Sequence, residues 1–474
     1  MKTRPMRATV TLVMIWFGLA WGGARGATLD VHPDNARWFR RNGEAIALFG
    51  SGLWTIIPDT RVDIGEHNEW YARWGANANR ATLFAFCCSV PDGKGLAPWP
   101  RTGPGQANDG LARFDLSRWD ERFWRRLHEY LSDCQRRGIV VLLQIWDEPF
   151  LEHGSERWHL HPFNPGNHIN HIEGLPATEG HEQNFAVGVE DQFYDPGNPD
   201  LMRFQDALVA RLLDETAGRY DNVIYEIGNE ICMDSRHPHE RRWQRHWIDV
   251  FGRYQREHNV KLLLSNDTRE ALFQDAADGL DVVNHHGFSG LRLPPSDGDN
   301  LSAQVYAAVC WHFQQYGRPV INSRPCSDPD RTHYGDVVTE EIGRILFWSY
   351  FCSAGHIVGF RTTEQSWKGG LAAERIIQSV QTFAARLSLD RFVPRKDLVD
   401  NGLCLADPGR EYVIYLPRGG GVTVNLGRAN ATFGATWYNP RTRTDEDAQM
   451  LAGGAPKRLI APDTDDWVLH LKTP

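Results

Sequence analysis

Eight short apolar runs alternate with amphipathic segments over most of this chain of 474 residues. The runs are rich in Val, Ile and Leu, as in IVVLLQIWD at 139–147, which is typical of strands buried on both faces. The amphipathic segment at 117–138 predicts a helix with Ser117 as its N-cap and Gly138 as its stop. We expect strands to begin near Leu48, Ala81, Val140, Val223, Lys261, Val282, Val320 and Ile357.

Strands that alternate with helices predict parallel βαβ units. Eight units in about 350 residues favour a (β/α)8 TIM barrel. An open doubly wound sheet is the alternative, but no GxGxxG motif follows the first strand. After Pro394 the pattern changes to short alternating strands with a Gly-rich turn, as in an antiparallel domain. We therefore expect a leader at 1–26, a (β/α)8 barrel at 27–394 and a small antiparallel β-sandwich at 395–474.

The leader has the layout of a secretory signal peptide. Lys2, Arg4 and Arg7 precede an apolar run at 8–23, and the small residues around Gly26 suit cleavage there. The run is shorter than the ~20 residues that a spanning helix needs. We expect a secreted or periplasmic protein with no stable membrane insertion, and an uncleaved membrane anchor is the alternative.

Charge and composition restrict the kinds of partner and cofactor that the protein can bind. A net charge of -9 argues against a nucleic-acid partner. The 18 Trp residues offer flat apolar faces that suit sugar rings, although core packing accounts for most of them. The eight Cys residues form no CxxC pair, so we expect no metal and no other cofactor. Cys87 and Cys88 are adjacent, and either a vicinal disulfide or two buried thiols fits that spacing.

The dipeptide Asn229-Glu230 ends the fourth predicted strand, in DNVIYEIGNE at 221–230. In TIM barrels the reacting side chains lie at the carboxyl ends of the strands. A carboxylic acid at such a position can protonate the leaving oxygen of a glycosidic bond, and a neighbouring amide can bind a sugar hydroxyl. Glu226 lies on the same strand but deeper, so we interpret it as a polar residue of the barrel interior.

Three stretches of the barrel region match a known family: FDLSRWDERFWRRLHEYLSDCQRRGIVVLLQIWD, HPFNPGN and YDNVIYEIGNEI. Through them and the Asn229-Glu230 pair, residues 35–390 resemble the clan A glycoside hydrolases and, more narrowly, the apiosidase-like (β/α)8 family. This resemblance implies hydrolysis of O-glycosidic bonds in a polysaccharide or oligosaccharide, with a carbohydrate substrate as the partner. It also implies that Glu230 is the general acid/base, and that Asn229 and Arg80 bind the sugar.

The C-terminal region resembles a β-domain that this family often carries and that is named for collagen binding. The matching stretches are EYVIYLPRGGGVTVNLG at 411–427 and WYNPRT at 437–442. From this resemblance we infer a β-sandwich packed on the barrel, and not collagen binding.

The resemblance fails at the end of the seventh strand, where retaining members of the clan carry a nucleophilic Glu. This chain reads RPVINSRP at 318–325, which places Arg324 at that position. A guanidinium has no lone pair to give, and its charge would lower the pKa of a nearby Glu230. The second carboxylate is therefore open: Glu364 is preferred and Asp147 comes next, and other strand-end candidates are Glu148, Asp267, Asp328 and Asp330.

A non-catalytic carbohydrate-binding protein, in which Arg324 pairs with Glu230, is the alternative function. In either case His285 and His286, at the end of the sixth strand, are candidate substrate contacts. The six His residues of 150–200 are interpreted as lining of a cleft rather than as zinc ligands. The predicted sugar-stacking residues are Trp54, Trp146, Trp158 and Trp367, whereas Trp38, Trp124 and Trp348 are predicted to lie in the core.

Overall fold

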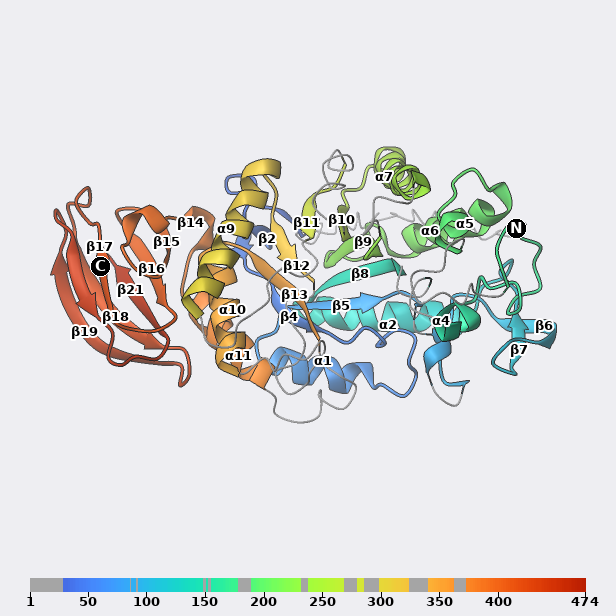
Figure 1. The fold of residues 1–474 in the computed structure, drawn as a ribbon, viewed down its shortest axis with the longest axis horizontal. Coiled ribbons are helices and arrows are strands. Elements are labelled where there is room, and N and C mark those ends of the chain that lie inside the picture. The colour runs from blue at the N-terminus through green and yellow to red at the C-terminus, as the bar shows by residue number, and fades with distance from the viewer. Residues whose placement is uncertain are drawn as a thin grey trace, which may run out of the picture.

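A closed barrel of eight parallel strands is the largest element of the computed structural model (Figure 1). The barrel confirms the predicted (β/α)8 fold, and every expected strand has a counterpart. Its strands are β4 (Phe49–Gly52), β5 (Ala78–Thr82), β8 (Val140–Asp147), β9 (Val223–Asn229), β10 (Leu263–Asp267), β11 (Val282–Asn284), β12 (Val320–Asn322) and β13 (His356–Arg361). The structure describes residues 29–85, 87–90, 93–147, 151, 155–177, 189–231, 238–267, 279–284, 298–323, 340–361 and 372–474.

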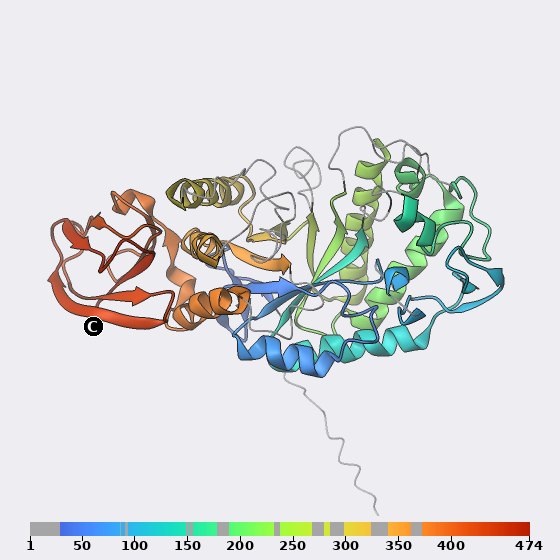
Figure 2. The same cartoon turned by 60° about the horizontal axis from the view of Figure 1, so that its bottom comes forward.

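Helices surround the barrel (Figure 2). The prediction of Ser117 as an N-cap is wrong, because the side chain of Asp120 accepts a hydrogen bond from the Arg122 amide at 3.0 Å and caps the helix instead. Gly138 ends that helix as predicted, in the left-handed conformation with φ 78°. The longer helices are α1 (Ile64–Arg73), α2 (Glu121–Arg137), α6 (Pro199–Thr216), α7 (Pro238–His258), α9 (Gly298–Tyr316), α10 (Glu340–Cys352) and α11 (Ala372–Ala384).

Short elements complete the barrel region: the helices α4 (Ser155–Leu160) and α5 (Val189–Phe193), the 3-10 turns η1 (Cys87–Ser89) and η4 (Leu389–Arg391), and the hairpin of β6 (Arg101–Gln106) and β7 (Ala112–Phe114). Over the part of the chain that the structure describes, no helix is both long enough and apolar enough to cross a membrane.

Apolar side chains fill the barrel at the amino ends of its strands. They form one buried cluster that includes Ala78, Val140 and Leu263, each at or next to the start of a strand. Phe39 joins the same cluster from a three-stranded sheet of β1 (Asp30–Val31), β2 (Phe39–Arg41) and β3 (Glu44–Ile46). Since this end is packed with apolar groups, the polar interior residues lie toward the carboxyl ends.

The C-terminal residues form the predicted antiparallel β-domain. Its six-stranded sheet and its two-stranded sheet enclose a second apolar core, in which the rings of Trp437 and Trp467 lie 6.4 Å apart. The first sheet has the order β14 (Val393–Pro394), β15 (Leu403–Asp407), β16 (Glu411–Leu416), β21 (Trp467–Lys472), β18 (Thr432–Asn439) and β19 (Thr444–Ala452), and the second pairs β17 (Gly421–Val424) with β20 (Lys457–Ile460).

This domain packs directly on α10 and α11, as Figure 1 and Figure 2 show. The ring of Trp348, fully buried as predicted, stacks on Tyr415 of β16 with 5.8 Å between centroids. Arg344 of α10 donates two hydrogen bonds to Asp466, at 3.1 and 3.0 Å, and Asp466 is almost fully buried. The barrel and the C-terminal domain therefore share one core.

The shared core predicts that the two parts unfold together. Replacing Trp348 with Ala removes a buried ring from both, so we expect a loss of about 3–5 kcal/mol in the free energy of unfolding. Calorimetry should show one transition for the parent protein, moved to a lower temperature in the variant. The control is Trp311→Ala, because Trp311 is 37% exposed; its effect should stay within about 0.5 kcal/mol. Two separate transitions in the parent protein would contradict the shared core.

Candidate active site

Arg80 of β5 is the centre of the polar barrel interior. It is fully buried, and its Nε and Nη2 donate to the Glu226 carboxylate of β9 at 2.9 and 2.5 Å. Asp267 of β10 lies 3.3 Å from the same Nη2. Burial alone would lower the pKa of Arg80, but the charges of Glu226 and Asp267 outweigh it and raise the pKa above its ordinary value. The cation is thus held by two carboxylates from neighbouring strands.

Asn229 links this ion cluster to the carboxyl end of the barrel. Its Oδ1 accepts a hydrogen bond from Arg80 Nη2 at 2.8 Å. Its Nδ2 donates to Asp147 Oδ1 at 2.7 Å. A cation on the oxygen side and a carboxyl group on the nitrogen side fix which way the amide points. Arg80, Asn229 and Asp147, three of the predicted site residues, therefore form one connected group.

Glu230 follows the last residue of β9 in a strained backbone conformation. Its φ is 59°, in the left-handed region, and only 7% of the residue is exposed. For a residue with a Cβ this conformation costs about 1–2 kcal/mol. Such strain is retained mostly where a side chain must point in one particular direction, as in active sites.

Asp147 ends β8 and is half-buried. The pKa of its carboxyl group is raised to about 7. Burial is the main cause and the nearby charge of Glu230 adds to it, while the hydrogen bond from Asn229 and the charge of Arg80 oppose the shift. Two carboxyl groups thus interact at this end of the barrel. One of them still holds a proton part of the time at neutral pH.

Trp54 lies beside the ion cluster, in the loop after β4. Its ring centroid is 5.8 Å from Cζ of Arg80, and the residue is partly exposed. Its backbone oxygen accepts a hydrogen bond from Thr82 Oγ1 at 2.9 Å, which ties this loop to the end of β5. Trp54 is thus placed beside the ion cluster, and its role as a sugar-stacking residue stays a prediction.

Trp146, by contrast, is a core residue, and its prediction as a sugar-stacking residue is wrong. It is 2% exposed, and its ring lies 5.8 Å from that of Trp243 and 5.9 Å from that of Trp247, both on α7. The position of Trp146 near a strand end could be predicted from the sequence, but not that two Trp rings of α7 cover it. Trp158 is also fully buried, and its Nε1 donates to the backbone oxygen of Pro176 at 2.9 Å.

Two His residues of the 150–200 region are also structural. Burial lowers the pKa of His161 to about 3 and that of His168 to about 4, so both rings are neutral at ordinary pH. His161 stacks on Trp158 with centroids 5.3 Å apart. Their prediction as lining of a cleft is therefore wrong, whereas His171 is exposed. Within the described ranges, no group of three or more His, Cys, Asp or Glu side chains is placed to hold a metal ion.

Several predicted site residues lie outside the described residues, namely Glu364, His285, His286, Arg324, Trp367, Glu148, Asp328 and Asp330. One contributor was missed: Asn284 Nδ2 donates to Glu226 Oε1 at 3.0 Å. The signal was its position, because Asn284 ends β11 immediately before the two His residues that were singled out. Asp267 was considered as a second reacting carboxylate, but its contact with Arg80 places it in the supporting ion cluster.

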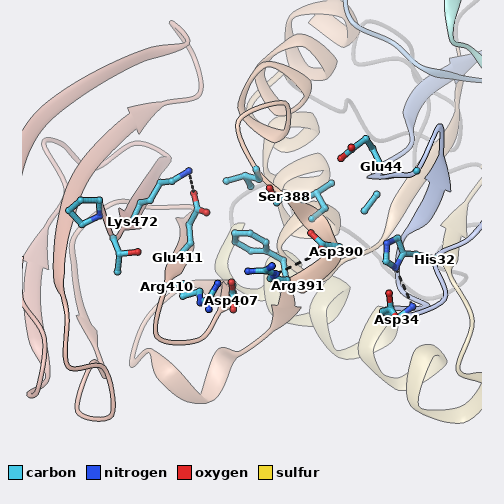
Figure 3. A pocket seen from close by; sticks show the side chains of 17 residues that line it. His32, Asp34, Glu44, Ser388, Asp390, Arg391, Asp407, Arg410, Glu411 and Lys472 are labelled. Atoms are coloured by element: carbon cyan, nitrogen blue, oxygen red, sulfur yellow. Dashed lines mark hydrogen bonds and ion pairs between the residues drawn. The ribbon is translucent and has the colours of Figure 1, made fainter.

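A groove of about 680 Å³ lies elsewhere, between the N-terminal sheet, the η4 turn and the C-terminal domain (Figure 3). Most of its lining side chains are charged or polar; Glu411 Oε1 and Lys472 Nζ, for example, are 3.3 Å apart. None of the residues of the candidate site lines it, so the groove is separate from the carboxyl end of the barrel.

Two family models match the sequence. One, described as a domain of unknown function (DUF6298), matches residues 96–306, and the other, described as "Putative collagen-binding domain of a collagenase", matches residues 396–472. The comparison with curated proteins gave no match.

Solved structures of glycoside hydrolases share the architecture over nearly the whole chain. One glycoside hydrolase is 13% identical, with a TM-score of 0.62 and coverage of 94% of this chain and 97% of that chain. A family 5 glycoside hydrolase from Bacteroides vulgatus is 14% identical, with a TM-score of 0.59 and coverage of 95% and 94%. The chain therefore has the fold of these glycoside hydrolases, including the C-terminal β-domain.

The backbone strain at Glu230 can be tested by comparing two truncations. Glu230→Gly and Glu230→Ala both remove the carboxyl group, but only Gly adopts a φ of 59° without strain. We expect the Gly variant to be more stable than the Ala variant by about 1 kcal/mol, the reverse of their usual order. Urea unfolding measures the difference. An Ala variant as stable as the Gly variant would show that the residue is not strained.

The raised pKa of Asp147 predicts a pH-dependent stability. A folded-state pKa of about 7 against an ordinary value of 3.8 means that the folded protein binds the proton more tightly than the unfolded chain. The stability that this proton contributes is present at low pH and is lost as the pH rises between these two values. The Asp147→Asn variant has no carboxyl group to titrate and does not lose this stability. The difference in melting temperature between the variant and the parent should therefore increase in favour of the variant between pH 4 and pH 7, by a few degrees. A constant difference across this range would contradict the shift.

Proposed function

We propose that this protein is a glycoside hydrolase that cleaves O-glycosidic bonds of a polysaccharide or oligosaccharide. The observation that carries the proposal is the pair Asp147 and Glu230, two interacting carboxyl groups at the carboxyl end of the barrel. Glycoside hydrolysis needs one carboxyl group that is protonated and one that is ionised. A pair that holds one proton near neutral pH meets that requirement.

In this proposal Glu230 protonates the leaving oxygen, the role that the sequence resemblance implies. Asp147 is the second carboxyl group, as a nucleophile or as the base for a water molecule. Since interacting carboxyl groups titrate as a pair, the single proton can sit on either group as the reaction requires. Asp147 is favoured over Asp267 for this role because the Asp267 carboxylate already forms an ion pair with Arg80.

The surrounding residues have positioning and binding roles in the proposal. Arg80 fixes the amide of Asn229, and Asn229 in turn orients Asp147 through its Nδ2. Trp54, which is partly exposed, would provide a face on which a sugar ring can stack. The protein would meet its substrate after export, with residues 1–26 as a cleaved leader, either secreted or in the periplasm. No metal or organic cofactor takes part in the proposed reaction.

Substrates with different leaving groups test these roles. On an unactivated oligosaccharide, Glu230→Gln and Asp147→Asn should each lower kcat/KM by about 10³-fold or more. On an aryl glycoside with an acidic leaving group, Glu230→Gln should lose much less, because such a group leaves without a proton. Asp147→Asn should lose as much on both substrates. Equal losses of both variants on both substrates would contradict the assignment.

The pair also predicts an alkaline limit of activity. As the pH rises through about 7, the last proton of the pair is lost, so kcat/KM should fall. Because the hydrogen bond from Asn229 lowers the pKa of Asp147, Asn229→Ala should move this limit to a higher pH, whatever its effect on the maximum rate. The limit is read from the pH dependence of kcat/KM. A limit that does not move would exclude Asp147 from the titrating pair.

A non-catalytic carbohydrate-binding protein is the second candidate, favoured by Arg324 at the position where the clan carries a nucleophile. The two functions differ on a broad panel of glycans. Binding without turnover by the parent protein would support the second candidate, whereas turnover that Glu230→Gln abolishes would support the first.

A further inference from the structure

Cys87 and Cys88 form a close pair of thiols in the η1 turn. Their Sγ atoms lie 3.4 Å apart. The turn belongs to the segment that follows β5, and the next residues of that segment are bound to the loop that carries Trp54. Leu96 N donates to the backbone oxygen of Pro58 at 2.8 Å, and Thr60 N donates to that of Lys94 at 3.2 Å. The segment that carries the pair is therefore attached to the loop that carries Trp54.

The two thiols have different surroundings. Cys88 is half-buried, and Nη2 of Arg101 lies 3.6 Å from its Sγ. Asp109 holds the Arg101 guanidinium in place, with 2.5 Å between Nη2 and Oδ2. Cys87 is only 4% exposed, and its hydrogen bond to Cys88 together with burial raises the pKa of its thiol. An incoming oxidant thus meets Cys88 first.

We propose that Cys87 and Cys88 are a reversible dithiol–disulfide site that reacts with disulfide oxidants. The Cys88 thiolate attacks one sulfur of the oxidant, forms a mixed disulfide and releases one thiolate. Cys87 Sγ then gives up its proton and attacks Cys88 Sγ, which closes the vicinal disulfide and releases the second thiol. The protein loses two electrons and two protons, and the oxidant leaves as two thiols.

Reversibility follows from the spacing of the two residues. Adjacent Cα atoms across a trans peptide are about 3.8 Å apart, which is shorter than the ~4.4–6.8 Å of ordinary disulfides. Strain of this kind makes a disulfide easier to reduce, so the site can respond to its surroundings instead of staying oxidised. This inference does not depend on the proposed glycosidase activity.

Mass spectrometry of the full-length protein can test the site, because trypsin releases residues 81–94 as one peptide that contains these two Cys residues and no other. The reduced protein is incubated with glutathione disulfide, treated with an alkylating reagent and digested without reduction. We expect this peptide about 2 Da below its dithiol mass and unalkylated, with both alkyl groups after dithiothreitol. Peptides with two alkyl groups before reduction, or a closed ring that dithiothreitol does not open, would overturn the proposal.

Three variants test the order of the two steps. Cys87→Ser should stop the reaction at the mixed disulfide, with glutathione on Cys88. Cys88→Ser should leave Cys87 unmodified, because Cys87 is buried. Arg101→Gln should slow the first step several-fold at the same pH, since it removes the positive charge beside Cys88. Glutathione on Cys87 in the Cys88→Ser variant at the parent rate would overturn the assignment of Cys88 as the attacking thiol.

Discussion

The buried ion cluster of Arg80, Glu226 and Asp267 is the interaction on which the candidate site depends. A guanidinium inside a barrel is stable only with charged partners, and removing one partner would leave a buried charge without compensation. The cluster joins β5, β9 and β10 through side chains as well as through the sheet. Asn229 extends it to Asp147 on β8. The positions of the proposed reacting groups are thus set by an ion pair one layer deeper in the barrel.

The two ends of the barrel have different roles: the amino ends of the strands stabilise the fold, and the carboxyl ends carry the candidate site. Apolar side chains pack the amino ends of the strands under the small sheet to which Phe39 belongs. The carboxyl ends carry charge, backbone strain at Glu230 and a carboxyl group with a raised pKa at Asp147. Each of these features costs free energy, and the packed end and the shared core with the C-terminal domain offset that cost.

The sequence was sufficient for the fold and for part of the site. The eight strands and the β-domain were predictable because each strand carries its own local pattern of Val, Ile and Leu. Arg80, Asn229 and Asp147 came together because the ends of parallel strands meet at one edge. Trp146 could not be placed, since a strand end does not tell whether a helix covers the ring. Asp120 replaced Ser117 for a similar reason, because both are good caps and only the path of the chain selects one.

The middle of the six-stranded sheet in the C-terminal domain has little free surface for a ligand. Strand β16 is buried along all six residues, because α10 covers one side of the sheet and the two-stranded sheet covers the other. Strand β19 at the margin has most of its residues exposed, and Arg458 and Ile460 of β20 are exposed on the two-stranded sheet. A ligand of this domain would therefore contact strand β19, the outer face of the two-stranded sheet or the loops. The middle of the six-stranded sheet, by contrast, serves to support the barrel and leaves no room for a ligand between the two.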